Sequence, residues 1–211
     1  DGTFGITGEC KQLSYDEIEK LEKHELNKIS LLYWRNSKIN FDSLDSLISS
    51  LEKKTNSEFL RRINDCEDEK VLKFLIKNNN NLKIKHSKDF IKTLWECCQI
   101  PDFSKKNYGN HVDVVKKVFE FLRSKSGKVT NEYMKKQLQD LDKYDGNIDT
   151  IANRISNVRT WAYVANKKDW ASNSDYWIER TKYIEDKLSD KLHEELTKSF
   201  IDKRISVLSR S

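Results

Sequence analysis

The sequence predicts an all-α protein, a multi-helix array of eight to ten helices with little or no sheet. The first observation behind this prediction is the scarcity of turn residues. The 211 residues contain six Gly and one Pro, whereas a β-rich fold needs a turn about every 8–12 residues. The second is the spacing of the apolar residues, which recur three and four positions apart along most of the chain, as one helix face requires.

The first third of the chain begins without helical periodicity, since residues 1–13 predict an extended or looped segment. Ser14 and Glu17 then form a capping box for a helix that ends near Leu26. Residues 29–34 predict a short strand or a buried turn. Four helices are expected next. The first is capped by Asp42 and carries Leu44, Leu47, Ile48 and Leu51, and the second spans 58–64 with Ser57 as its cap. The third follows Asp65 and carries Val71–Ile76, and the fourth spans 88–99 with Ser87 as its cap.

Further helices are expected after Pro101, which ends the preceding helix because the residue before a proline is disfavoured in the α region. Ser172 with Asp175 predicts a capped helix, and a separate final helix is expected from about Asp190. Between Pro101 and Ser172 three helices are expected. They span 111–125 with Asn110 at the start, 131–143 with Thr130 at the start, and 148–166 after Gly146. Gly109, Gly127 and Gly146 are expected in the loops between these helices. A domain boundary is expected near 108–110 or near 143–146.

The charge of the chain is nearly balanced, with 39 Lys and Arg against 34 Asp and Glu and a net charge of +5. That balance argues against a polybasic arm. No run of 18 apolar residues and no basic-then-apolar leader is present, so we expect a soluble, intracellular protein without a transmembrane helix or signal peptide. Because the chain begins with Asp1, it is expected to be a processed protein or a fragment.

Catalytic and metal motifs are not recognisable. The Gly127-Lys128 pair lacks the first glycine of a nucleotide-binding loop and is followed by Val129. The four cysteines show no C-x-x-C spacing, which argues against zinc or disulfide chemistry, and Cys97-Cys98 are expected to be small buried hydrophobes. The four histidines, His24, His86, His111 and His193, lie on polar stretches and are expected at the surface.

Two stretches combine basic and aromatic residues, the composition that binds single-stranded nucleic acid through phosphate contacts and base stacking. The first is Tyr33-Trp34-Arg35-Asn36. The second comprises Arg154, Arg159, Trp161, Tyr163, Lys167, Lys168 and Trp170. Arg159 and Tyr163 are four residues apart and so share a helix face. Aromatic residues at helical spacing also fit helix packing, so nucleic-acid contact and packing both remain open for these residues.

Several segments resemble the C-terminal region of one helicase family. They are Asp1–Gly8 (D-G-T-F-G-I-T-G), Tyr33–Asn36 leading into Phe41, Leu94–Phe103 (L-W-E-C-C-Q-I-P-D-F), Asp145–Trp170 and Ile184–Arg204. The family is the mitochondrial degradosome RNA helicase and its α-proteobacterial relatives, DExH-type members of helicase superfamily two. The resemblance covers nearly the whole chain, and the bacterial branch is the more similar.

The resemblance implies an accessory role beside a motor. Residues 1–13 would be the remnant of the second RecA-like domain, 14–108 a first helical subdomain and 109–211 a C-terminal one. ATP and Mg would be bound by the upstream motor domains, with no cofactor in this segment. The implied partners are RNA, or alternatively DNA, the protein's own RecA-like domains and an exoribonuclease, but no membrane. The implied location is the bacterial cytoplasm, or the mitochondrial matrix in a eukaryote.

Two other functions compete with the accessory role. The chain could be an all-α docking module for a nuclease or another partner subunit, using an exposed aromatic patch. It could also be a self-standing basic helical protein that binds duplexes as a helix-turn-helix does.

Overall fold

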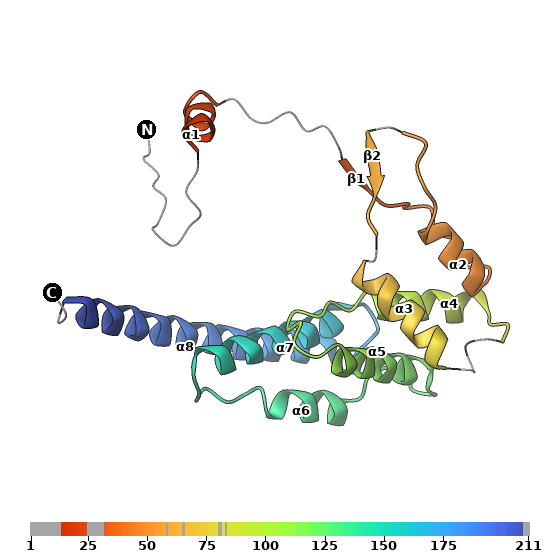
Figure 1. Cartoon of the computed structure of the whole chain (residues 1–211). Helices are drawn as coiled ribbons and strands as arrows, with labels where there is room; N and C mark the ends of the chain where they lie inside the picture. The colour runs from red at the N-terminus through yellow and green to blue at the C-terminus, as the bar shows by residue number, and fades with distance from the viewer. Residues whose placement is uncertain are drawn as a thin grey trace. The chain divides into compact units, whose positions relative to one another are not determined.

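The computed structural model describes residues 14–24, 32–57, 59–64, 66–79, 82 and 84–208 (Figure 1). Over these ranges it contains eight helices and one two-stranded sheet, which confirms the all-α prediction. The expected segment 1–13 lies outside the described residues. The elements are α1 (Tyr15–Glu22), β1 (Leu32–Trp34), α2 (Leu44–Leu51), β2 (Leu60–Arg62), α3 (Glu67–Asn78), α4 (Lys88–Cys98), α5 (Tyr108–Arg123), α6 (Asn131–Gln139), α7 (Ile148–Asn166) and α8 (Ser174–Leu208).

The chain divides into two compact units. The first unit comprises Asp1–Arg35 and Lys54–Ile63, and the second comprises Asn36–Lys53 and Asn64–Ser211. The expected boundary after residue 108 instead falls in the first turn of α5, which Asn107 caps by accepting a hydrogen bond from the Asn110 backbone N–H. Gly109 is therefore helical, and the second unit contains α2 to α8.

Local capping explains most of the helix starts. Ser87 and Thr130 cap α4 and α6 as predicted, each accepting a hydrogen bond from a backbone N–H three residues later. The cap of α2 is Ser43, one residue after the predicted Asp42. Gly146 marks the loop before α7 as expected, and its φ of +122° is a conformation that side chains with a Cβ rarely adopt.

The predicted helix at 58–64 is wrong, because this segment contains β2. A helix of seven residues is marginal in water without strong tertiary support. Leu60–Arg62 instead pair with β1 as a parallel strand, so tertiary pairing overrides the weak helix signal.

Helices α7 and α8 form the longest packed pair of the second unit (Figure 1). Helix α7 buries Ile151, Ile155 and Val158, and α8 buries Ile184 and Leu188. The segment before α6 joins this pair through main-chain hydrogen bonds, since the Val129 N–H donates to the Trp170 carbonyl at 2.7 Å. The core of the second unit thus combines residues from α2 to α8.

Helix α8 corrects the prediction of two separate helices around Asp190. It runs without a break for 35 residues, because no Gly or Pro interrupts it and Leu188 and Leu192, on either side of Asp190, both pack into the core. Ion pairs support the turns that follow. Lys191 lies 2.9 Å from Glu194 and 3.0 Å from Glu195, and both glutamates also pair with Lys198. Such pairs at three- and four-residue spacing stabilise a helix.

Burial confirms one expectation and corrects another. Cys97 and Cys98 are buried, as predicted, and desolvation raises the pKa of both thiols. His111, expected at the surface, is only 8% exposed. Among the described helices, none combines the length and the apolar character needed to cross a membrane.

Candidate nucleic-acid interface

The first basic and aromatic stretch lies in a small parallel sheet, which we call the ribbon (Leu32–Trp34 and Leu60–Arg62). Tyr33 pairs with Arg61 and Trp34 with Arg62. Further hydrogen bonds extend the pairing, since the Leu32 N–H donates to the Phe59 carbonyl at 2.8 Å. Because successive side chains of a strand alternate between faces, Tyr33 and Arg61 share one face and Trp34 and Arg62 share the other.

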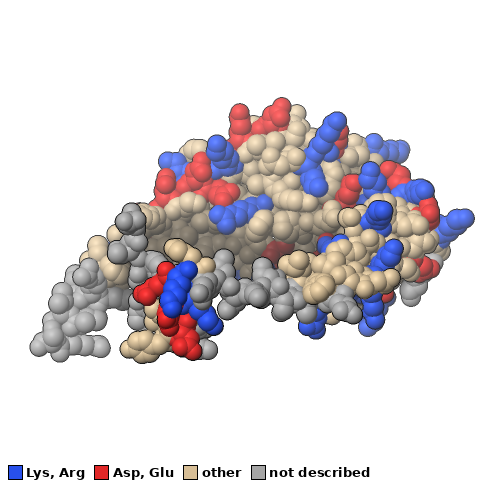
Figure 2. Space-filling view, turned by 90° about the horizontal axis from the view of Figure 1, so that it is seen from above, with Lys and Arg blue, Asp and Glu red and all other residues tan. Residues whose placement is uncertain are grey.

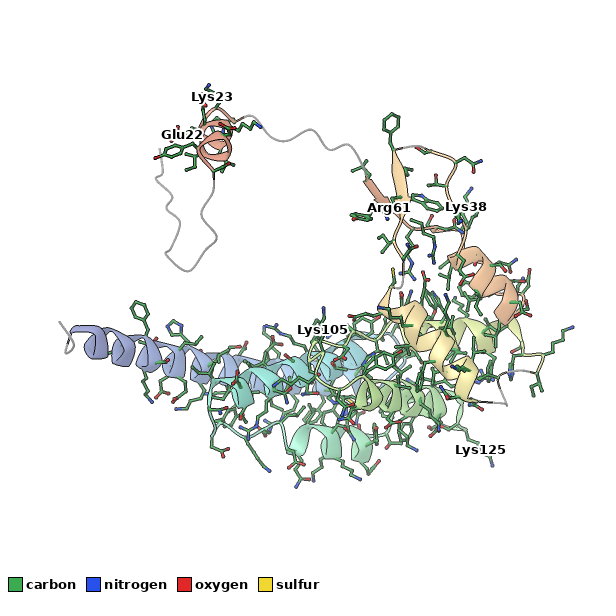
Figure 3. The ribbon with its side chains drawn as sticks, viewed as in Figure 1. Glu22, Lys23, Lys38, Arg61, Lys105 and Lys125 are labelled. Atoms are coloured by element: carbon green, nitrogen blue, oxygen red, sulfur yellow. The ribbon has the colours of Figure 1, made fainter. Side chains whose placement is uncertain are left out.

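The face that carries Tyr33 and Arg61 is open to solvent. Tyr33 is 73% exposed, and Phe59, two residues before Arg61, is 70% exposed. Arg61 is exposed and makes no hydrogen bond or ion pair with any residue that the structure describes (labelled in Figure 3). An uncommitted guanidinium beside two exposed rings is suited to a phosphate contact next to base stacking.

The two predicted ribbon residues are less accessible than their neighbours. Trp34 and Arg35 are both half-buried. The residue after them, Asn36, belongs to the second unit and is buried, where its amide donates to the carbonyls of Lys38 and Ser50 at 2.9 and 2.8 Å. Within the Tyr33–Asn36 stretch, Tyr33 is therefore exposed to solvent, whereas Asn36 is buried and hydrogen-bonded in the second unit.

Arg154 holds the loop before α7 rather than facing solvent. Its side chain is 15% exposed, and its Nη1 donates to the carbonyl of Lys143 at 2.8 Å and to that of Asp145. The Asp145 carboxylate lies 3.6 Å away. These contacts commit the guanidinium to its own chain, as the packing interpretation requires.

Two further residues of the α7 stretch also serve packing between elements. Nε of Arg159 donates to Oε1 of Glu185 on α8 at 2.7 Å. Trp161 is 4% exposed, and its ring meets that of Tyr133 on α6 edge to face at 5.7 Å. The Trp161 ring thus lies in the core rather than on the surface.

The C-terminal end of α7 keeps some surface character. Lys167 is half-buried, with Nζ 5.1 Å from the ring centre of Tyr163 and 5.8 Å from that of Trp170. Lys168 is exposed and has no hydrogen-bond or ion-pair partner within the described ranges. Of the second stretch, Tyr163, Lys167 and Lys168 therefore retain access to a ligand, as does Arg159, whose side chain is 50% exposed beside its ion pair.

Sequence reasoning missed Arg61, Arg62 and Phe59 because it assigned their segment to a helix. The five residues from Phe59 to Ile63 read F-L-R-R-I, which lacks the apolar and polar alternation of a half-buried strand, so the sequence held no local signal for this pairing.

Charge is mixed in sign on the face of the molecule shown in Figure 2. Figure 2 shows Lys and Arg interspersed with Asp and Glu on the face in view, in keeping with the net charge of +5. Local geometry, rather than a large basic field, therefore distinguishes the ribbon.

Comparisons with protein-family models, with curated protein sequences and with solved structures gave no match to this chain.

Proposed function

We propose that this chain is the helical accessory region of an ATP-dependent helicase of the mitochondrial degradosome type. In this proposal the ribbon contacts single-stranded RNA, with DNA as the alternative ligand, while motor domains outside this chain bind ATP and Mg. The observation that carries the proposal is the pairing of exposed Tyr33 with uncommitted Arg61. The sequence resemblance supports the helicase context and the bacterial cytoplasm or mitochondrial matrix as its location.

The expected contact is sequence-independent and weak in the isolated chain. Stacking on an aromatic ring contributes about 1–3 kcal/mol per base. Each phosphate contact to a single strand contributes about 0.7 to the salt dependence of log K. The ribbon offers few such contacts, so high affinity requires the motor domains beside it.

Two ribbon variants separate the contributions of charge and stacking. Arg61→Gln should lower the salt slope of RNA binding by about 0.7. Tyr33→Ala should weaken binding by about 1–3 kcal/mol while leaving the slope unchanged. The measurement is fluorescence anisotropy with a labelled single-stranded RNA over a range of salt concentrations.

The charge-matched control is Lys125→Gln, since Lys125 is an exposed cation in the second unit without a described partner (labelled in Figure 3). If this variant lowers the salt slope as much as Arg61→Gln does, the ribbon is not the contact site. In the complete helicase, equal unwinding by wild type and Tyr33→Ala would show that the ribbon does not guide the strand.

A second candidate function is the docking module, with an exoribonuclease as the expected partner. The observation that favours it lies on α8, whose residues Leu196, Phe200 and Ile201 are 48%, 61% and 49% exposed. A pull-down with the purified exoribonuclease would test it. Capture by the wild type, loss of capture in Phe200→Ser and no measurable RNA binding would favour docking over the accessory role.

A further inference from the structure

A small polar pocket lies between the loop before α5, the start of α5 and α7. Its volume is about 180 Å³, below the roughly 300–1,000 Å³ of pockets for drug-sized ligands. A single planar ring system fits this size better than a whole dinucleotide. The pocket belongs entirely to the second unit and shares no residue with the ribbon.

His111 is the first indication that the pocket is built for a ligand. It lines the pocket, is 8% exposed, and its imidazole makes no hydrogen bond with a residue that the structure describes. Burial lowers the pKa of His111, although Asp102 and Glu67 oppose the shift. The neutral ring offers one donor and one acceptor to a ligand in the pocket.

Asparagine amides supply further neutral polar groups, beside Asp102, Ser104 and Thr160 in the same lining. Oδ1 of Asn107 accepts from the Asn110 N–H, which leaves the Asn107 amino group available. Nδ2 of Asn157 donates to the Asn153 carbonyl at 2.8 Å, which leaves the Asn157 Oδ1 available. The side-chain amide of Asn153 has no partner among the described residues.

The pocket offers both donors and acceptors, and its one carboxylate, Asp102, already accepts through Oδ1 from the N–H groups of Ser104 and Lys105. An anion needs donors and a metal ion needs acceptors, whereas the edge of a nucleobase presents both. Trp161 and Val114 provide apolar surface in the pocket wall, and exposed Lys106 lines it without an ion pair to any described residue. A nucleobase could therefore hydrogen-bond to the amides while its phosphate lies near Lys106.

We propose that this pocket, lined by His111, Asn153, Asn157 and Trp161, binds one base of a single-stranded nucleic acid. The proposal rests on the proposed function, because it assigns a nucleotide subsite to the same ligand. If the pocket binds a base, RNA binding by the chain acquires a base preference, since amide groups distinguish the edges of the bases.

The first test titrates the whole wild-type chain with each of the four ribonucleoside monophosphates, followed by NMR of the Asn side-chain amides. We expect shifts at Asn153 and Asn157 with at least one nucleotide and none with ribose 5-phosphate. Equal shifts with ribose 5-phosphate, or no shifts with any nucleotide, would overturn the base pocket. This measurement needs no variant and so does not depend on a mutant fold.

The second test compares Asn157→Leu with Asn166→Leu on the same helix. Both residues donate Nδ2 to the carbonyl four residues earlier at 2.8 Å, but Asn166 does not line the pocket. Losing a hydrogen bond should weaken nucleotide binding by up to about tenfold in Asn157→Leu alone. Equal affinities in the two variants would refute the role of Asn157.

The ribbon variant Arg61→Gln distinguishes the two proposals. Nucleotide shifts that persist in Arg61→Gln while RNA binding is unaffected by that variant support the pocket and reject the ribbon. RNA binding that depends on Arg61, together with no nucleotide shifts, rejects the pocket and supports the ribbon.

Discussion

Replacing Arg154 by Ala tests whether this residue packs or binds RNA. The substitution removes the hydrogen bonds from its guanidinium to the carbonyls of Lys143 and Asp145. Hydrogen bonds from charged groups contribute about 1.5–3 kcal/mol each, but the exposed loop regains part of this by hydration. The Asp145 carboxylate, 85% exposed, adds little. We therefore expect a loss of about 2–3 kcal/mol in the free energy of unfolding.

The assay is urea denaturation followed by circular dichroism at the helix band. With an m-value of about 2–3 kcal/mol/M, the midpoint should fall by roughly 1 M. The matched control is Arg159→Ala on the same helix, whose ion pair with Glu185 is partly exposed and contributes about 0–1 kcal/mol. An Arg154→Ala variant with an unchanged midpoint but weaker RNA binding would refute the packing interpretation.

Two further predictions concern the backbone and pH. Gly146→Ala should lower the melting temperature more than Gly127→Ala does. An added Cβ at position 146 meets the Thr150 side chain at 3.0 Å, whereas no atom lies within 4 Å of one at position 127. Thermal unfolding of the two variants measures the difference. Burial lowers the pKa of His111 below 6.5, against the opposing effect of Asp102 and Glu67. As pH falls below about 6.5 the unfolded chain protonates first. Wild type should therefore lose more stability than His111→Gln between pH 7.5 and 5.5 in urea titrations, and equal losses would contradict this.

The helices of the second unit were predictable because their signals are local. Ser87 and Thr130 precede apolar residues at helical spacing, and both act as caps in the structure. The same local logic fails at Asp190, where a residue typical of caps lies inside α8. A cap residue marks a helix start only where the preceding backbone leaves the helix. Before Asp190 the backbone stays helical, since Leu188 packs into the core.

The candidate site was only partly predictable, because its geometry depends on pairing between distant segments. Trp34 and Arg35 were identified from composition, whereas Arg61 lies opposite Tyr33 only through the parallel pairing. The burial of His111 and Trp161 likewise depends on contacts among α5, α6 and α7. No periodicity within one helix shows which neighbouring helix will cover a given face.

The chain connects the ribbon to the helical core more than once. Parallel sheets are normally covered on both faces, and an isolated pair of strands is marginally stable. Here the connection between β1 and β2 runs through α2, which buries Leu47 and Leu51 in the core of the second unit. The chain passes between the units after Arg35, Lys53 and Ile63. Each strand of the ribbon is therefore followed in the chain by a segment of the second unit, while the face with Tyr33 and Arg61 is exposed.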